Sequence, residues 1–117
     1  MQFVVLTAIV PDAKEEETIA IAKKSGAGSV TILHGKNIGL EEKKVFFGLT
    51  LEESVSVLLF VMPKRISTRI FKEMKKELDL DAKENPNGMI FTFPLTHLAG
   101  IDTNEIELFE KEVEDAL

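Results

Sequence analysis

Apolar residues gather in four short runs along this chain, and stretches of helical period lie between them. The runs span residues 2–10, 28–34, 53–62 and 88–95. They are rich in β-branched and aromatic residues and have the length of strands. Pro11 follows the first run directly and ends it. The pattern therefore predicts four strands.

Two helices are predicted between these strands. Asp12 with Glu15 has the form of an N-cap pair, and the helix that follows ends before Ser25 and Gly26. In the second helix an apolar residue recurs every fourth position, and Phe71 widens that stripe, which consists of Ile66, Ile70, Met74 and Leu78. The order βαββαβ predicts a ferredoxin-like α+β sandwich, with both helices on one face of an antiparallel sheet.

The first strand is apolar on both of its sides. Alternate positions place Phe3, Val5 and Ile9 on one side and a second apolar group on the other, which consists of Val4, Leu6, Ala8 and Val10. Two helices can cover only one of these sides. An apolar face of this size is not expected to remain in water. The sequence therefore predicts that the second face is covered by another subunit, by the C-terminal segment, or by both.

Charge divides the chain into a body, residues 1–101, and an acidic tail, residues 102–117. The tail carries seven acidic residues against Lys111, which equals the net charge of −6 of the whole chain. Asp102 and Glu105 form a possible capping pair, and the tail has an apolar stripe at helical spacing, which consists of Ile106, Phe109, Val113 and Leu117. We expect an acidic helix that docks on the body or binds a partner.

Two loops carry candidate chemistry. Residues 35–51 form a long connection that begins with Gly35, Lys36 and Asn37, and this composition suits either a phosphate-binding backbone with one ammonium or an ordinary turn. Residues 79–88 contain the turn sequence NPNG, whose Gly88 would also leave room for a ligand.

Four basic residues lie on one stripe of the second helix, namely Arg65, Arg69, Lys72 and Lys76. This stripe is either a surface that attracts an anion or an ordinary solvated helix face. His34 suits a phosphate contact or a solvated strand end. The chain has no cysteine, which excludes disulfides, and no catalytic motif, so we do not expect an enzyme. We also expect a cytoplasmic protein that is not membrane-embedded and binds no nucleic acid.

Two segments resemble the PII nitrogen-regulator family. GSVTILHGKNIG is similar to the second strand and loop entrance of PII proteins, and GMIFTFPL is similar to their fourth strand. Phe46, Phe47 and Gly48 stand where the PII T-loop carries Tyr-Arg-Gly. The resemblance covers residues 3–101. It implies a homotrimeric signalling protein that binds a small anionic effector, such as an adenine nucleotide, in clefts between subunits and regulates an enzyme or transporter.

The chain also departs from the PII pattern. Met89 replaces the lysine of the phosphate-binding loop, while Gly100 and Asp102 replace two arginines, so ATP binding in the usual PII manner is not expected. The T-loop is shorter, and without any tyrosine the chain cannot be nucleotidylylated there. Eight residues are predicted to contact an anion: Ser29, Thr31, Gly35, Lys36, Asn37, Gly88, Lys64 and Arg65. Lys64 and Arg65 would substitute for the lost cations.

Three alternatives remain open at this stage. The strand order is shared with trimeric CutA-type proteins, which are associated with metals or stress. The acidic tail alone would suit an interaction module that has no ligand. A small enzyme of ferredoxin-like architecture is the third.

Overall fold

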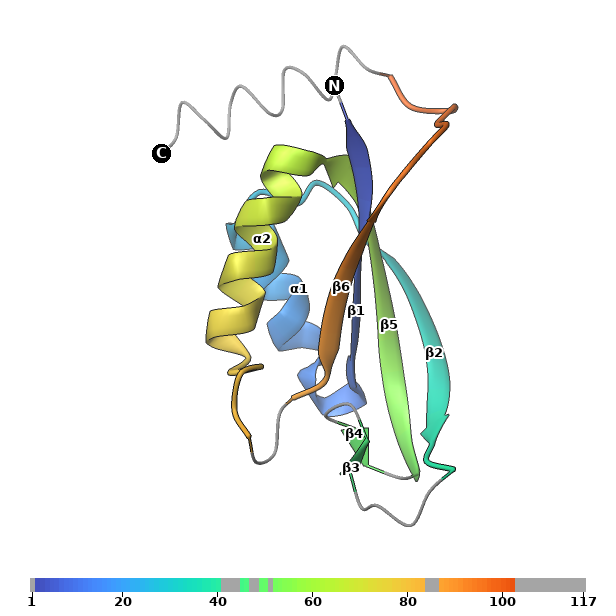
Figure 1. The fold of residues 1–117 in the computed structure, drawn as a ribbon, viewed down its shortest axis with the longest axis vertical. Helices are drawn as coiled ribbons and strands as arrows, with labels where there is room; N and C mark the ends of the chain where they lie inside the picture. Colours follow the sequence, from blue (N-terminus) through green and yellow to red (C-terminus); the bar gives the residue numbers. More distant parts are fainter. Residues whose placement is uncertain (1, 41–44, 47–48, 51, 84–86, 103–117) are drawn as a thin grey trace.

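The computed structural model describes residues 2–40, 45–46, 49–50, 52–83 and 87–102. Two helices, α1 and α2, cover one face of a four-stranded antiparallel sheet whose order is β2-β5-β1-β6 (Figure 1). The elements in chain order are β1 (Phe3–Pro11), a 3-10 turn η1 (Asp12–Lys14), α1 (Glu15–Lys24), β2 (Thr31–Ile38), β3 (Val45–Phe46), β4 (Leu49–Thr50), β5 (Glu52–Pro63), α2 (Lys64–Glu77) and β6 (Met89–Pro94). The predicted ferredoxin-like order is confirmed.

The core lies between the helices and one face of the sheet. From the central strands it takes Leu6, Ala8, Leu58 and Phe60, which are at most 1% exposed. The predicted apolar stripe contributes Ile66, Ile70 and Met74 of α2 and Leu78, which directly follows this helix. Burying each large apolar side chain is worth about 1.5–3 kcal/mol, so this stripe fixes α2 on the sheet. No described helix is long and apolar enough to cross a membrane.

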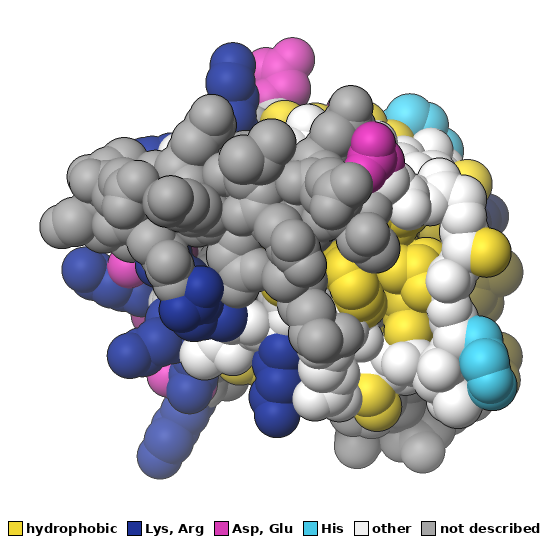
Figure 2. All heavy atoms as spheres, turned by 90° about the horizontal axis from the view of Figure 1, so that it is seen from above, with side chains coloured by type: hydrophobic (Ala, Val, Ile, Leu, Met, Phe, Trp, Pro, Cys, Tyr) yellow, Lys and Arg dark blue, Asp and Glu magenta, His cyan; other side chains and the backbone are white. Residues whose placement is uncertain are grey.

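The opposite face of the sheet is apolar, and neither α1 nor α2 lies over it. Strand pairing places Val5 of β1 between Val61 of β5 and Phe93 of β6, and places Leu33 of the edge strand β2 beside Val57. Leu33, Val61 and Phe93 are 52%, 45% and 44% exposed. In Figure 2 hydrophobic side chains gather on the side of the molecule away from most of the lysines and arginines. The prediction of an apolar second face is confirmed.

Two boundaries differ from the sequence prediction. The second strand starts at Thr31 and continues to Ile38, because Gly35, Lys36 and Asn37 pair with β5 as regular ladder residues. They therefore belong to a strand and not to a loop or turn. Farther along, β3 and β4 pair with each other within the predicted long loop. Phe47 and Gly48 lie outside the described residues.

The start of α1 also differs. Asp12 opens the 3-10 turn η1, and no side chain caps α1, which begins at Glu15. The other end agrees with prediction, since α1 ends at Lys24 and Gly26 follows with a φ of 114°. The predicted acidic helix lies outside the described residues, apart from Asp102.

Candidate functional site

Three of the predicted anion-binding residues, Gly35, Lys36 and Asn37, lie at the end of the sheet where β1 finishes. Gly35 pairs with Val55 of β5, and Lys36 pairs with Ser54. Because side chains alternate along a strand, Lys36 lies on the helix face of β2, while Asn37 lies on the open face. The structure therefore brings Gly35, Lys36 and Asn37 together in one short segment but on opposite faces of the edge strand.

Gly88 is near the same end of the sheet, at the opposite edge. It directly precedes β6, in which Met89 pairs with Ile9 of β1. Strands β1 and β5 separate it from β2, so Gly88 and Gly35 are about 14 Å apart at a spacing of roughly 4.8 Å per strand. Neither glycine lines the two hollows described below.

Close backbone packing requires glycine at position 88. Its φ is 117°, and a Cβ added there would lie 2.3 Å from the Ile9 carbonyl oxygen and 3.0 Å from Val10 Cα. The side-chain amide of Asn87 donates to the Leu78 carbonyl at 2.9 Å and fixes the preceding turn. Gly35 differs, because a Cβ there would meet nothing within 4 Å. Gly88 is thus explained by close backbone packing, whereas Gly35 leaves open space on β2.

The remaining predicted residues lie toward the other end of the sheet. Lys64 begins α2, and its backbone N–H donates to the Gln2 carbonyl at 2.9 Å. Along β5, Pro63 is eight positions after Val55, which corresponds to about 26 Å. Lys64 and Arg65 therefore do not stand in for the missing cations near Gly35 of the same chain.

Ser29 and Thr31 also lie away from Gly35. Ser29 borders a hollow of about 210 Å³ beside Ile19 and Lys23 of α1. Thr31 is opposite Leu59 at the start of β2. Of the eight predicted residues, the structure therefore brings only Gly35, Lys36 and Asn37 together in one segment, while the other five lie elsewhere on the chain.

A polar cluster that the sequence analysis did not predict links α1 and the turn before it to the sheet. It consists of Asp12, Glu15, His34 and Ser56. His34 Nε2 lies 2.6 Å from Glu15 Oε1. The Ser56 hydroxyl lies 2.8 Å from both Glu15 Oε1 and Asp12 Oδ1, so its single proton is shared between two carboxylates. Two hydrogen bonds lower the pKa of Glu15, and the one with His34 has a larger effect than the one from Ser56. The predicted N-cap pair of Asp12 and Glu15 therefore has another role. Both side chains accept a hydrogen bond from Ser56 of the sheet, and neither caps α1.

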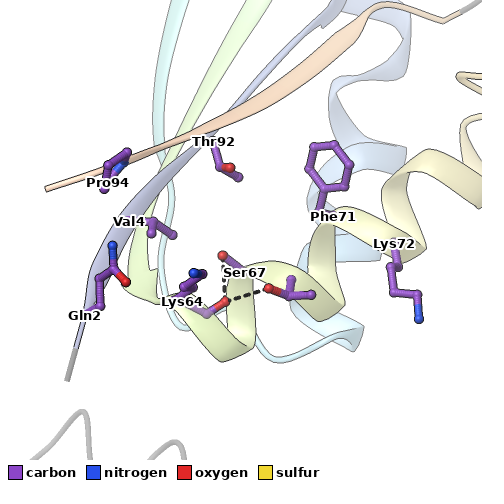
Figure 3. A pocket seen from close by; sticks show the side chains of 9 residues that line it. Gln2, Val4, Lys64, Ser67, Phe71, Lys72, Thr92 and Pro94 are labelled. Atoms are coloured by element: carbon purple, nitrogen blue, oxygen red, sulfur yellow. Dashed lines mark hydrogen bonds between the residues drawn. The ribbon is translucent and has the colours of Figure 1, made fainter.

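A groove that the sequence did not predict lies between α2 and the edge strand β6. Its volume is about 350 Å³, and it is lined by Val4, Phe71, Thr92 and Pro94 together with polar residues of α2 (Figure 3). Within the described ranges no group of acidic residues and histidines is arranged to hold a metal ion.

No family model and no curated protein sequence matches this chain. Solved structures do match. CPII, a nitrogen regulatory PII-like protein from Thiomonas intermedia K12, bound to ADP, AMP and bicarbonate, has a TM-score of 0.63 at 12% identity, over 86% of this chain and 98% of that one. The B. subtilis GlnK–ATP complex has a TM-score of 0.62 at 19% identity, over 81% and 84%.

A second structure of B. subtilis GlnK has a TM-score of 0.57 at 17% identity, over 82% of this chain and 87% of that one. The matches span 84% to 98% of each compared protein. The chain therefore has the fold of PII proteins.

Proposed function

We propose that this chain is a cytoplasmic PII-like signalling protein, without catalytic activity, that binds a small anionic effector and regulates a protein target such as an enzyme or transporter. The observation that carries the proposal is the PII fold, shared over most of the chain with proteins solved with ATP or with ADP, AMP and bicarbonate. The short segment from Gly35 to Asn37 on an edge strand supplies the candidate contact.

The effector site is proposed to lie between copies of the chain. Gly35 and Gly88 lie on opposite edges of the sheet, so a pocket that uses both needs a second subunit. The open apolar face, with Leu33, Val61 and Phe93 half exposed, supplies the surface that a homotrimer would bury. Assembly and effector binding are therefore coupled in this proposal.

The cation proposed to contact an anionic effector is Lys36. The Lys36 side chain is exposed and makes no ion pair with another residue of the described part of the chain. An adenine nucleotide is one suitable class. Because Met89, Gly100 and Asp102 occupy the positions of the usual phosphate-binding cations, an effector with fewer phosphates than ATP, or a small carboxylate, suits the site better.

Thermal denaturation in the presence of ATP, ADP, AMP, cyclic nucleotides, 2-oxoglutarate, bicarbonate and divalent metals tests this proposal. A ligand that binds the native state raises the melting temperature. Stabilisation by a nucleotide or small anion is the expected result. Stabilisation by metals alone would favour the CutA-type alternative, and no stabilisation by any of them would favour an interaction module without a ligand.

A further inference from the structure

The groove between α2 and β6 is large enough to hold several side chains. Its volume of about 350 Å³ lies in the range of ligand sites in proteins. Val4 and Pro94 contribute apolar surface from the sheet, and Phe71 contributes it from α2 (Figure 3). Of these, Phe71 is only partly buried although it packs against the core. The groove therefore offers an apolar floor to whatever binds there.

The charged residues that line this groove are basic. Lys64 and Lys72 line the groove, and none of the described residues that line it is acidic. The two acidic residues of α2, Glu73 and Glu77, do not line the groove, and Glu77 lies 3.2 Å from Lys24 of α1. In addition, α2 begins after Pro63 without a side-chain cap and with no acidic residue in its first turn, so the positive end of its dipole is not neutralised from within the helix.

We propose that the acidic C-terminal segment, residues 103–117 of the same chain, occupies this groove. The segment carries six acidic residues against Lys111, and its apolar residues have the spacing of one helix face, at Ile106, Phe109, Val113 and Leu117. Apolar anchors in a groove with complementary charges at its rim are a common mode of helix recognition. The inference does not depend on the effector site near Gly35.

The connection along the chain favours this occupant over a separate molecule. Pro94 lines the groove, and only residues 95–102 separate it from the acidic segment. Eight residues span at most about 29 Å, so the segment stays within reach of Lys64 and Lys72. A short tether of this kind gives an effective concentration on the order of millimolar, and weak contacts are then sufficient for occupancy.

A tryptophan reporter tests the proposal in the full chain, which has no tryptophan or tyrosine of its own. In Phe109→Trp we expect blue-shifted emission that is protected from iodide. Adding Lys64→Glu and Lys72→Glu replaces attraction by repulsion and is expected to lower occupancy about tenfold, with red-shifted emission and free quenching. The matched pair Lys23→Glu and Lys83→Glu makes the same charge change at exposed positions outside the groove and should leave the emission unchanged.

Carbodiimide cross-linking of the full chain identifies the contact directly. The expected products join Lys64 or Lys72 to glutamates of residues 105–114. In a sample assembled from equal amounts of ¹⁵N-labelled and unlabelled chains, each product should carry a single isotope, because both ends belong to one chain.

Three results would overturn the proposal. The first is a solvent-exposed indole in Phe109→Trp with the groove intact, and the second is an emission spectrum that the groove substitutions leave unchanged. The third is a set of cross-links that carry mixed isotopes. None of these results bears on effector binding near Gly35, so failure here is distinguishable from failure of the proposed function.

Discussion

His34 Nε2 of the edge strand β2 lies 2.6 Å from Glu15 Oε1 in the first turn of α1. Among the described strands, β2 pairs with β5 alone, and its side chains are exposed or half buried. The contact therefore links the edge that carries Lys36 to the helical layer. Ser56 of β5 strengthens this link through its hydrogen bond to the same carboxylate oxygen.

The first prediction concerns acid stability. The bonds from His34 and Ser56 lower the pKa of Glu15 in the folded protein relative to the unfolded chain. The stabilisation is therefore present above the unfolded-state pKa and is lost as pH falls through the lower folded-state pKa. We expect Glu15→Gln to be less stable than the parent at neutral pH and to lose less stability on acidification below the usual carboxyl range.

Urea denaturation at a series of pH values measures this difference. Glu16→Gln is the control, because Glu16 is the exposed neighbour of Glu15 on the same helix. Parallel stability curves for Glu15→Gln and Glu16→Gln would show that the contact between His34 and Glu15 contributes nothing to folding.

The second prediction compares two glycines. Gly88→Ala places a Cβ 2.3 Å from the Ile9 carbonyl oxygen at a φ of 117°, so it combines a backbone clash with a strained conformation. We expect a loss of about 2–4 kcal/mol in the free energy of unfolding. Gly35→Ala meets no atom within 4 Å, and we expect it to be neutral or stabilising by up to about 1 kcal/mol. Equal effects in denaturant titrations would contradict the described turn before β6.

The third prediction concerns assembly. Val61 and Phe93 lie on the open apolar face, beside Val5. We expect the parent chain to sediment as a trimer and Val61→Asp with Phe93→Asp to dissociate it, because burying two unpaired carboxylates is unfavourable. Lys76→Asp, on the exposed side of α2, should leave the trimer intact. A parent protein that sediments at 13.0 kDa at micromolar concentration would exclude this interface.

Much of the fold could be predicted from periodicity. Ile66, Ile70 and Met74 recur at the spacing of one helix face, and all three are buried in the structure. The alternation in β1 likewise divided its side chains into two apolar groups, because side chains on a strand alternate with a period of two. Which group faces the helices became clear only from the structure, where Leu6 and Ala8 are buried in the core. These patterns are local, and they are strong enough to survive in a single sequence.

The candidate site was less predictable because it depends on non-local pairing. Gly35, Lys36 and Asn37 have the composition of a turn, yet ladder hydrogen bonds with β5 hold them in a strand. The same limit applies to Asp12, whose local spacing from Glu15 suggested a cap. Its actual partner, Ser56, is 44 residues away in the sequence.

The central claim is that a small anionic effector binds at the β2 edge, with Lys36 as its cation. The most direct measurement is calorimetric titration of the best-stabilising anion into the parent protein, Lys36→Ala and the control Lys75→Ala, which removes an exposed lysine of α2. We predict that Lys36→Ala weakens binding by about 1.5–3 kcal/mol, the range of a charge-assisted hydrogen bond, and that Lys75→Ala leaves the affinity unchanged. Equal affinities for all three proteins, or no binding of any anion to the parent, would contradict the claim.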